Sequence, residues 1–188
     1  MTKNQKSFEE NGYCIVKKVI TPELRDFVTQ YALFDEMQDF SSDGDQVPTA
    51  HSKYADPAME SMLIYLQEVI EKNTGLEVFP TYSFFRVYRQ GDELKNHIDR
   101  PSCEISSTLC LNYSYDQKDY QWPIFMNGNK INLEPGDMAV YRGCDLPHWR
   151  EPFDIEDEEA WHVQGFFHYV NQLGPYADYK FDKRKSLG

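Results

Sequence analysis

The chain has 188 residues, of which 31 are Asp or Glu and 19 are Lys or Arg, so its formal net charge is −12. This charge repels phosphate backbones and argues against nucleic acid as a partner. No stretch approaches the roughly 18 apolar residues of a membrane span. The N-terminus, MTKNQKSFEENGY, lacks the apolar core of a secretory signal. We therefore expect a protein of the cytoplasm with no membrane partner.

The length is suited to one domain over residues 1–188, and 12 Phe, 13 Tyr and 3 Trp provide for a sizeable core. The four cysteines have no C-x-x-C spacing and the chain is long for a disulfide scaffold, which favours reduced thiols. They are Cys14, Cys103, Cys110 and Cys144. The oligomeric state stays open at this stage.

The first predicted elements are a strand over residues 13–20 and a helix after it. Thr21 as N-cap and Pro22 at the first helical position mark the start of that helix. An apolar stripe at helical spacing is expected to pack against the core. Its members are Leu24, Phe27, Val28, Tyr31 and Phe34.

Residues 39–56 are polar, rich in Ser, Asp and Gly, and show no periodicity. Such a segment predicts a long loop, either a lid over a site or an ordinary surface loop. His51 lies within it and is expected to be solvated. A second helix follows over residues 57–74, with Pro57 at its start and Gly75 at its end.

From Leu76 onward the pattern is typical of strands. Tyr82, Phe84, Arg86 and Tyr88 alternate with Ser83, Phe85 and Val87. Strands are predicted over 76–89, 94–99, 104–113, 122–126, 130–133, 138–143, 148–150 and 161–170. Asn127-Gly128 predicts a hairpin between two of them.

About eight short strands without helical crossovers indicate a mainly β fold, an antiparallel sandwich or a jelly-roll barrel. We expect the helices of a flank at about 13–75 to pack on one sheet of a barrel at about 76–170. Residues 171–188, broken by Gly and Pro, are expected to form a frayed tail.

A candidate metal site rests on His97, Asp99 and His148. Residues two apart in a strand share a face, so His97 and Asp99 would project into one cavity. Two histidines and one carboxylate are the facial triad of non-haem Fe(II) oxygenases, which leaves positions open for a co-substrate and O2. The alternatives are a surface salt bridge for the first pair and a buried, hydrogen-bonded histidine for His148.

Two segments carry a resemblance to a known family. The first holds Tyr88-x-x-Gly91, Leu94, His97-x-Asp99 and Leu111-Asn112, and the second is Glu134-Pro135-Gly136-Asp137-Met138-Ala139-Val140 before His148. Together they resemble the prolyl-hydroxylase-like branch of the Fe(II)/2-oxoglutarate-dependent dioxygenases, over about residues 76–170. The resemblance implies a double-stranded β-helix that uses Fe(II), 2-oxoglutarate and O2. It implies a hydroxylase that releases succinate and CO2.

The chain departs from this family where a basic residue is expected about ten positions beyond the distal histidine. Positions 156–162 read EDEEAWH, with neither Arg nor Lys. Arg150, two residues after His148, would point into the same cavity and suits bidentate carboxylate binding. Its alternative role is a salt bridge with the acidic loop at 154–159. His162 is the second candidate for holding the far carboxylate of 2-oxoglutarate.

Further candidates are weaker. Tyr88 occupies the family position whose hydroxyl lines the co-substrate pocket, and Thr108 shares a strand face with Ser106, Cys110 and Asn112; core packing is the alternative for both. Arg100 and Trp122 are candidates for contacting the substrate. The alternative for Arg100 is a surface ion pair, and the alternative for Trp122 is packing. His168 in FFHYV is expected to be a hydrogen-bonded core histidine.

Substrate choice depends on loops such as 39–56 and 113–121, so a peptide or protein side chain, an amino acid and a small metabolite all stay open. Two rival functions remain. One is a cupin-like isomerase or hydrolase using zinc or manganese on the same triad. The other is a non-catalytic jelly-roll module that binds a sugar or peptide.

Overall fold

The computed structural model describes residues 1–44, 46–115 and 120–188. Its helices are α1 (Lys3–Asn11), α2 (Pro22–Gln38) and α3 (Pro57–Thr74), with 3-10 segments η1 (Pro101–Cys103) and η2 (Ala177–Lys183). Its strands are β1 (Tyr13–Val16), β2 (His51–Tyr54), β3 (Val78–Tyr88), β4 (Leu94–His97), β5 (Ile105–Ser114), β6 (Ile124–Met126), β7 (Asn129–Ile131), β8 (Met138–Arg142), β9 (His148–Arg150) and β10 (Trp161–Asn171).

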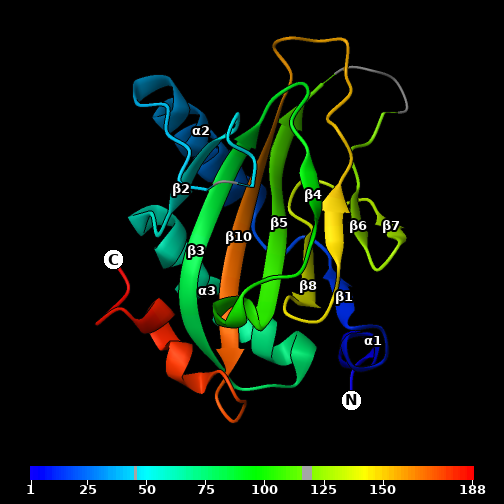
Figure 1. Cartoon of the computed structure of the whole chain (residues 1–188), viewed down its shortest axis with the longest axis vertical. Helices are drawn as coiled ribbons and strands as arrows, with labels where there is room; N and C mark the ends of the chain where they lie inside the picture. The colour runs from blue at the N-terminus through cyan, green and yellow to red at the C-terminus, as the bar shows by residue number, and fades with distance from the viewer. Residues whose placement is uncertain (45, 116–119) are drawn as a thin grey trace.

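The strands form two sheets. The larger has the order β1-β8-β5-β10-β3-β2, and the smaller has the order β4-β9-β6-β7. Each pairing between these strands is antiparallel. The long strands β3, β10 and β5 stand side by side, with α2 and α3 against one face of that sheet (Figure 1). The fold is therefore mainly β, with helices packed on one sheet.

Local signals set the helix ends as the sequence predicts. The Thr21 hydroxyl accepts a hydrogen bond from the Leu24 amide at 3.3 Å, and Pro22 occupies the first helical turn. Helix α3 starts at Pro57 and is capped by Gly75, whose φ of 77° is left-handed. Glycine adopts this backbone conformation at no steric cost, so the chain can leave the helix there.

The alternation along β3 divides the interior in two. Phe85 and Val87 face the helices and join the apolar cluster that contains Leu63 and Leu66 of α3. On the other face, Tyr88 packs in a second cluster with Leu94 of β4. The neighbouring strands β5 and β10 alternate in the same way, because successive side chains of a strand point to opposite faces of its sheet, and Leu109 and Phe167 join the first cluster. Gln164 of β10 lies on the opposite face and bonds to Arg150 of the small sheet.

The prediction of a loop over 39–56 with a solvated His51 is wrong in part. Residues 51–54 form β2, which pairs with β3 at the edge of the large sheet. His51 is fully buried, its Nε2 lies 2.9 Å from Asp35 Oδ2, and its Nδ1 accepts from the Ser41 amide. Partners from α2 and β3 make this site, and no local pattern encodes them. Position 45 of this segment lies outside the described residues.

Two further expectations differ from the structure. Phe27 and Phe34 are 68% and 62% exposed, because α2 buries the stripe centred on Val28 and Ala32. The C-terminal segment is not a frayed tail, since η2 packs beside β3 and Arg184 pairs with Glu60. Within the described ranges, no helix is long and apolar enough to cross a membrane.

Candidate metal centre

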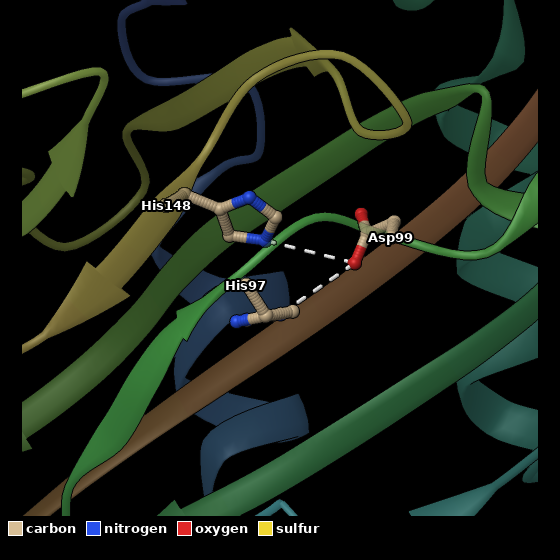
Figure 2. A group of neighbouring side chains, drawn as sticks. All are labelled: His97, Asp99 and His148. Atoms are coloured by element: carbon tan, nitrogen blue, oxygen red, sulfur yellow. Dashed lines mark ion pairs between the residues drawn. The ribbon is translucent and has the colours of Figure 1, made fainter.

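Three predicted ligands converge between the two sheets. His97 ends β4 and His148 begins β9, and the two residues are paired in the register of the small sheet. Asp99 lies beyond the end of β4, so the strand predicted to residue 99 is two residues too long. The Oδ1 atom of Asp99 is 3.6 Å from His97 Nε2 and 3.6 Å from His148 Nε2 (Figure 2). One ligand atom from each residue lies within 4.8 Å of the others.

Backbone carbonyls orient both imidazoles. His97 Nδ1 is 2.7 Å from the Lys95 carbonyl, and His148 Nδ1 is 2.9 Å from the Leu146 carbonyl. A carbonyl only accepts hydrogen bonds, so Nδ1 carries the hydrogen and Nε2 presents its lone pair. Both lone pairs are thereby available to a metal ion on the side of Asp99. This arrangement is the outer-shell orientation found around metal-ligating histidines.

Asp99 is held by the large sheet and by the β8–β9 loop. Its amide donates to the Gly143 carbonyl at 2.8 Å, and its Oδ2 accepts from the Ser106 hydroxyl at 2.7 Å. His168 Nδ1 is 2.9 Å from the same hydroxyl oxygen. Because the one Ser106 hydrogen goes to Asp99, His168 donates to Ser106. This chain fixes the carboxylate and leaves Oδ1 to the histidines.

Burial favours the neutral form of His148 and His168. Burial lowers the pKa of His148, although the charge of Asp99 opposes the shift. Burial also lowers the pKa of His168 to about 4. Neutral imidazole is the form that binds a metal ion. The donor set, two imidazole nitrogens and one carboxylate oxygen, suits a divalent first-row transition metal.

A pocket of about 380 Å³ opens beside the triad. Its wall includes the three ligands and also Arg86, Arg100, Tyr82, Phe84 and Phe166. The wall thus combines aromatic and apolar side chains with a similar share of polar and charged ones, so it offers both packing surface and groups that can orient a small molecule.

Arg150 is 1% exposed and lies on β9 behind this pocket wall. Its guanidinium donates to the Trp122 carbonyl at 2.7 Å and to Gln164 Oε1 at 3.3 Å, and it lies 4.6 Å from the Trp122 ring centroid. In the part of the chain that the structure describes, its Nε has no hydrogen-bond partner. Among the described residues, no carboxylate lies within ion-pair distance. In the described structure the side chain is therefore a buried cation without an acid beside it, and the alternative role, a salt bridge with the loop at 154–159, is not seen.

Gln164 connects the other predicted co-substrate residues. Its Nε2 donates to Thr108 Oγ1 at 2.6 Å, and its Oε1 lies 2.9 Å from His162 Nε2. Burial and the charge of Arg150 lower the pKa of His162 to about 3, so this side chain is neutral near pH 7. A neutral imidazole offers no positive charge to a carboxylate. Of the two candidates for holding the far carboxylate of 2-oxoglutarate, Arg150 is therefore favoured over His162.

Tyr88 is fully buried at the edge of the same region. Its ring packs edge-on against Trp122 with centroids 4.8 Å apart, and its hydroxyl accepts from Arg86 Nη1 at 3.1 Å. The structure thus gathers Tyr88, Thr108, Arg150 and His162 around two residues, Gln164 and Trp122. Gln164 is not among the predicted site residues, although its position on the polar face of β10, between His162 and His168, is a signal that points to it.

Both predicted substrate residues already make polar contacts with other groups of the protein. Arg100 lines the pocket but forms an ion pair with Asp182 at 2.8 Å and lies 4.6 Å from the Tyr82 ring centroid. Trp122 is 5% exposed, donates from its indole to the Glu151 carbonyl, and lies behind the pocket wall. Both placements match the packing alternatives more closely than direct substrate contact.

No protein-family model matches the chain. No curated protein matches it either. Solved structures do resemble it. A Pseudomonas putida prolyl-4-hydroxylase superposes with a TM-score of 0.65 and 17% identity, covering 87% of this chain and 95% of that one. HygX from Streptomyces hygroscopicus, solved with nickel, 2-oxoglutarate and hygromycin B, superposes with a TM-score of 0.68 and 10% identity, covering 100% of this chain and 96% of that one.

A third similar structure is SnoN, a non-heme α-ketoglutarate-dependent epimerase from nogalamycin biosynthesis. It gives a TM-score of 0.74 at 9% identity, covering 99% of this chain and 90% of that one. At such identities the likeness concerns the fold, and these proteins differ in the reactions that their names describe. The chain therefore has a fold similar to that of 2-oxoglutarate-dependent oxygenases over nearly its whole length, with the candidate ligands His97, Asp99 and His148 between its sheets.

Proposed function

We propose that this protein is an Fe(II)- and 2-oxoglutarate-dependent dioxygenase that hydroxylates a small molecule or peptide. The convergence of His97 Nε2, His148 Nε2 and one oxygen of Asp99 is the observation that carries the proposal. Three ligands on one side of an ion leave positions for a bidentate keto acid and O2. We also propose that residues 76–170 form a double-stranded β-helix within one domain of residues 1–188.

The chain supplies ligation, orientation and exclusion of water. His97, Asp99 and His148 would hold Fe(II), and Arg150 would receive the far carboxylate of 2-oxoglutarate, with Tyr88 and Thr108 beside it. Arg150 suits this role because it is a fully buried guanidinium with an unpartnered Nε. When bound, Fe(II), 2-oxoglutarate and O2 supply the oxidising chemistry that yields hydroxylated product, succinate and CO2.

An anaerobic titration with Fe(II) and then 2-oxoglutarate tests the proposal. The chelated pair should give a weak visible charge-transfer band, and O2 should then release succinate. His97→Ala should abolish both signals. Asn96→Ala is the matched control, because its exposed side chain lies on the same strand and makes no hydrogen bond in the described structure; it should retain both.

The same titration separates the rival functions. A cupin-like isomerase or hydrolase would bind metal but give no band with 2-oxoglutarate. A non-catalytic binding module would bind no metal tightly. A folded protein that holds Fe(II) and releases no succinate with any substrate would refute the dioxygenase.

A further inference from the structure

Arg86 places a second buried guanidinium in the wall of the pocket that contains the metal ligands. The residue lies on β3 and is 3% exposed. Asp43 and Asp99 also line the pocket, but no ion pair joins Arg86 to either of them or to another described carboxylate. Burial of an unpaired cation is costly, so such a group commonly marks a position where an anion binds.

The surroundings of Arg86 position the guanidinium but leave most of its N–H donors without a hydrogen-bond acceptor. Its Cζ lies 5.2 Å from the ring centroid of Phe84, 5.4 Å from that of Tyr88 and 5.8 Å from that of Phe166. Its single protein hydrogen bond in the described structure runs to the Tyr88 hydroxyl, and its Nε has no partner. A guanidinium has five N–H donors, so most of them remain available.

Arg86 is separate from the group proposed to hold 2-oxoglutarate. Tyr88 lies between the two arginines, because its hydroxyl accepts from Arg86 while its ring packs on Trp122, over which Arg150 lies. Arg86 lines the pocket beside the triad, whereas Arg150 lies behind the wall. The two cations can therefore receive two different anionic groups.

The third arginine near the pocket is already neutralised. Arg100 makes two hydrogen bonds of 2.8 Å to the carboxylate of Asp182, one to each oxygen. Among the described residues that line the pocket, Arg86 is thus the arginine without an acid partner. The adjoining wall is apolar, with Phe84, Phe166 and Leu94.

We propose that Arg86 binds a carboxylate on the substrate, so that this enzyme acts on a small organic acid with an apolar body. This inference rests on the proposed function, because it assigns the substrate of the same site. A carboxylate matches one planar guanidinium in charge and geometry. A phosphate monoester carries about two negative charges at pH 7, whereas Arg86 is the described arginine of this wall whose single positive charge has no acid partner.

Binding of paired probes to the full chain, loaded anaerobically with Fe(II) and 2-oxoglutarate, tests the proposal. Loading occupies the co-substrate site, so that calorimetry reports the remaining site. The pairs are phenylacetate with phenylacetamide and isovalerate with isovaleramide, and benzyl phosphate is the third arm. At least one carboxylate should bind about tenfold more tightly than its amide, as expected for a charge-assisted hydrogen bond.

Two variants locate that preference. Arg86→Gln should remove it, and Arg86→Lys should retain part of it, which controls for folding of the first variant. Arg100→Gln is the matched control, since this arginine lines the same pocket but pairs with Asp182; it should keep the preference. The charge-transfer band should persist in each loaded variant and shows that the metal site is intact.

Several outcomes would overturn the proposal. A wild-type protein that binds acid and amide equally, or binds neither, has no carboxylate site. Tighter binding of benzyl phosphate would assign the site to phosphate esters. Loss of the band in Arg86→Gln would place Arg86 with the co-substrate. Absence of the band in wild type would refute the proposed function as well, whereas a band without the preference refutes this inference alone.

Discussion

Ser106 donates a hydrogen bond to Oδ2 of Asp99 at 2.7 Å, and this contact directs the other carboxylate oxygen to the two histidines. Ser106 belongs to β5 of the large sheet, whereas His97 and His148 belong to the small sheet. The candidate metal centre thus depends on both sheets, and the serine couples its geometry to the packing between them.

Removal of this hydroxyl should weaken metal binding. Ser106→Ala frees the Asp99 carboxylate to rotate, and loss of such a supporting contact lowers metal affinity by about 10- to 100-fold. Anaerobic calorimetry with Fe(II) measures the change. Ser107→Ala is the matched control, because its hydroxyl is also buried but donates to the Phe167 carbonyl. Equal losses in the two variants would mean that the effect comes from strand packing.

A methyl group at position 143 should damage the same carboxylate. A Cβ on Gly143 would overlap the Cys103 carbonyl and Asp99 Oδ2, and would lie 2.6 Å from Ser106 Oγ. The carboxylate must then move, so Gly143→Ala should lower Fe(II) affinity by about tenfold or more. Gly44→Ala, where the nearest atoms would be 3.5 Å away, should keep the wild-type affinity. Unchanged affinity in Gly143→Ala would show that the β8–β9 loop yields without moving Asp99.

Loss of Arg150 should weaken the binding of 2-oxoglutarate and leave the affinity for Fe(II) unchanged. Truncation of one member of a buried charge pair costs roughly 2–5 kcal/mol, so Arg150→Ala should weaken 2-oxoglutarate binding by at least about 30-fold. The charge-transfer titration gives this affinity, and Fe(II) calorimetry gives that of the metal. Arg89→Ala, which removes an arginine paired with Glu36, is the control. Strong weakening by His162→Ala with none by Arg150→Ala would transfer the role to His162.

Asp182 should stabilise the C-terminal segment in a pH-dependent way. Burial raises its pKa, but hydrogen bonds from Arg100, Ser102 and Tyr54 outweigh burial and lower it from 3.8 to about 2. A lowered carboxyl pKa contributes stability above the unfolded value, and this contribution is lost as the pH falls from 3.8 towards 2. The shift corresponds to roughly 2 kcal/mol.

Urea unfolding of wild type and Asp182→Asn at several pH values checks this contribution. The difference in unfolding free energy should be about 2 kcal/mol near pH 6 and should shrink below pH 4. Asp178→Asn is the control, because Asp178 is 69% exposed in an ion pair of 3.5 Å with Lys183 and should change stability by under about 0.5 kcal/mol. A difference for Asp182 that stays constant with pH would exclude its ionisation as the cause.

Much of the fold follows from local signals. Thr21-Pro22 and Pro57 to Gly75 set two helices, and Asn127-Gly128 makes the predicted hairpin with positive φ at both residues. These signals act through backbone dihedrals and capping hydrogen bonds that involve residues close in sequence, so they can be recognised from the sequence alone. The spacing of His97 and Asp99 is similarly local.

Contacts between segments that lie far apart in the sequence could not be predicted from it. His51 is buried through Asp35 and Ser41, and the exposure of Phe27 depends on how α2 rotates against the sheet. Asp182 reaches Arg100 across the fold and turns an expected frayed tail into a docked segment. Each outcome depends on surfaces that exist only after the chain has folded.

The sequence by itself determined which chemical groups are present: two histidines and a carboxylate at a spacing suited to a metal, and arginines where anions would bind. The tertiary structure alone decided their states. It brought His148 beside His97 through the β4–β9 pairing, buried Arg150 and Arg86 on different sides of Tyr88, and neutralised Arg100 with Asp182. A residue's type fixes its possible charge, but burial and partners fix whether that charge is left to bind a ligand.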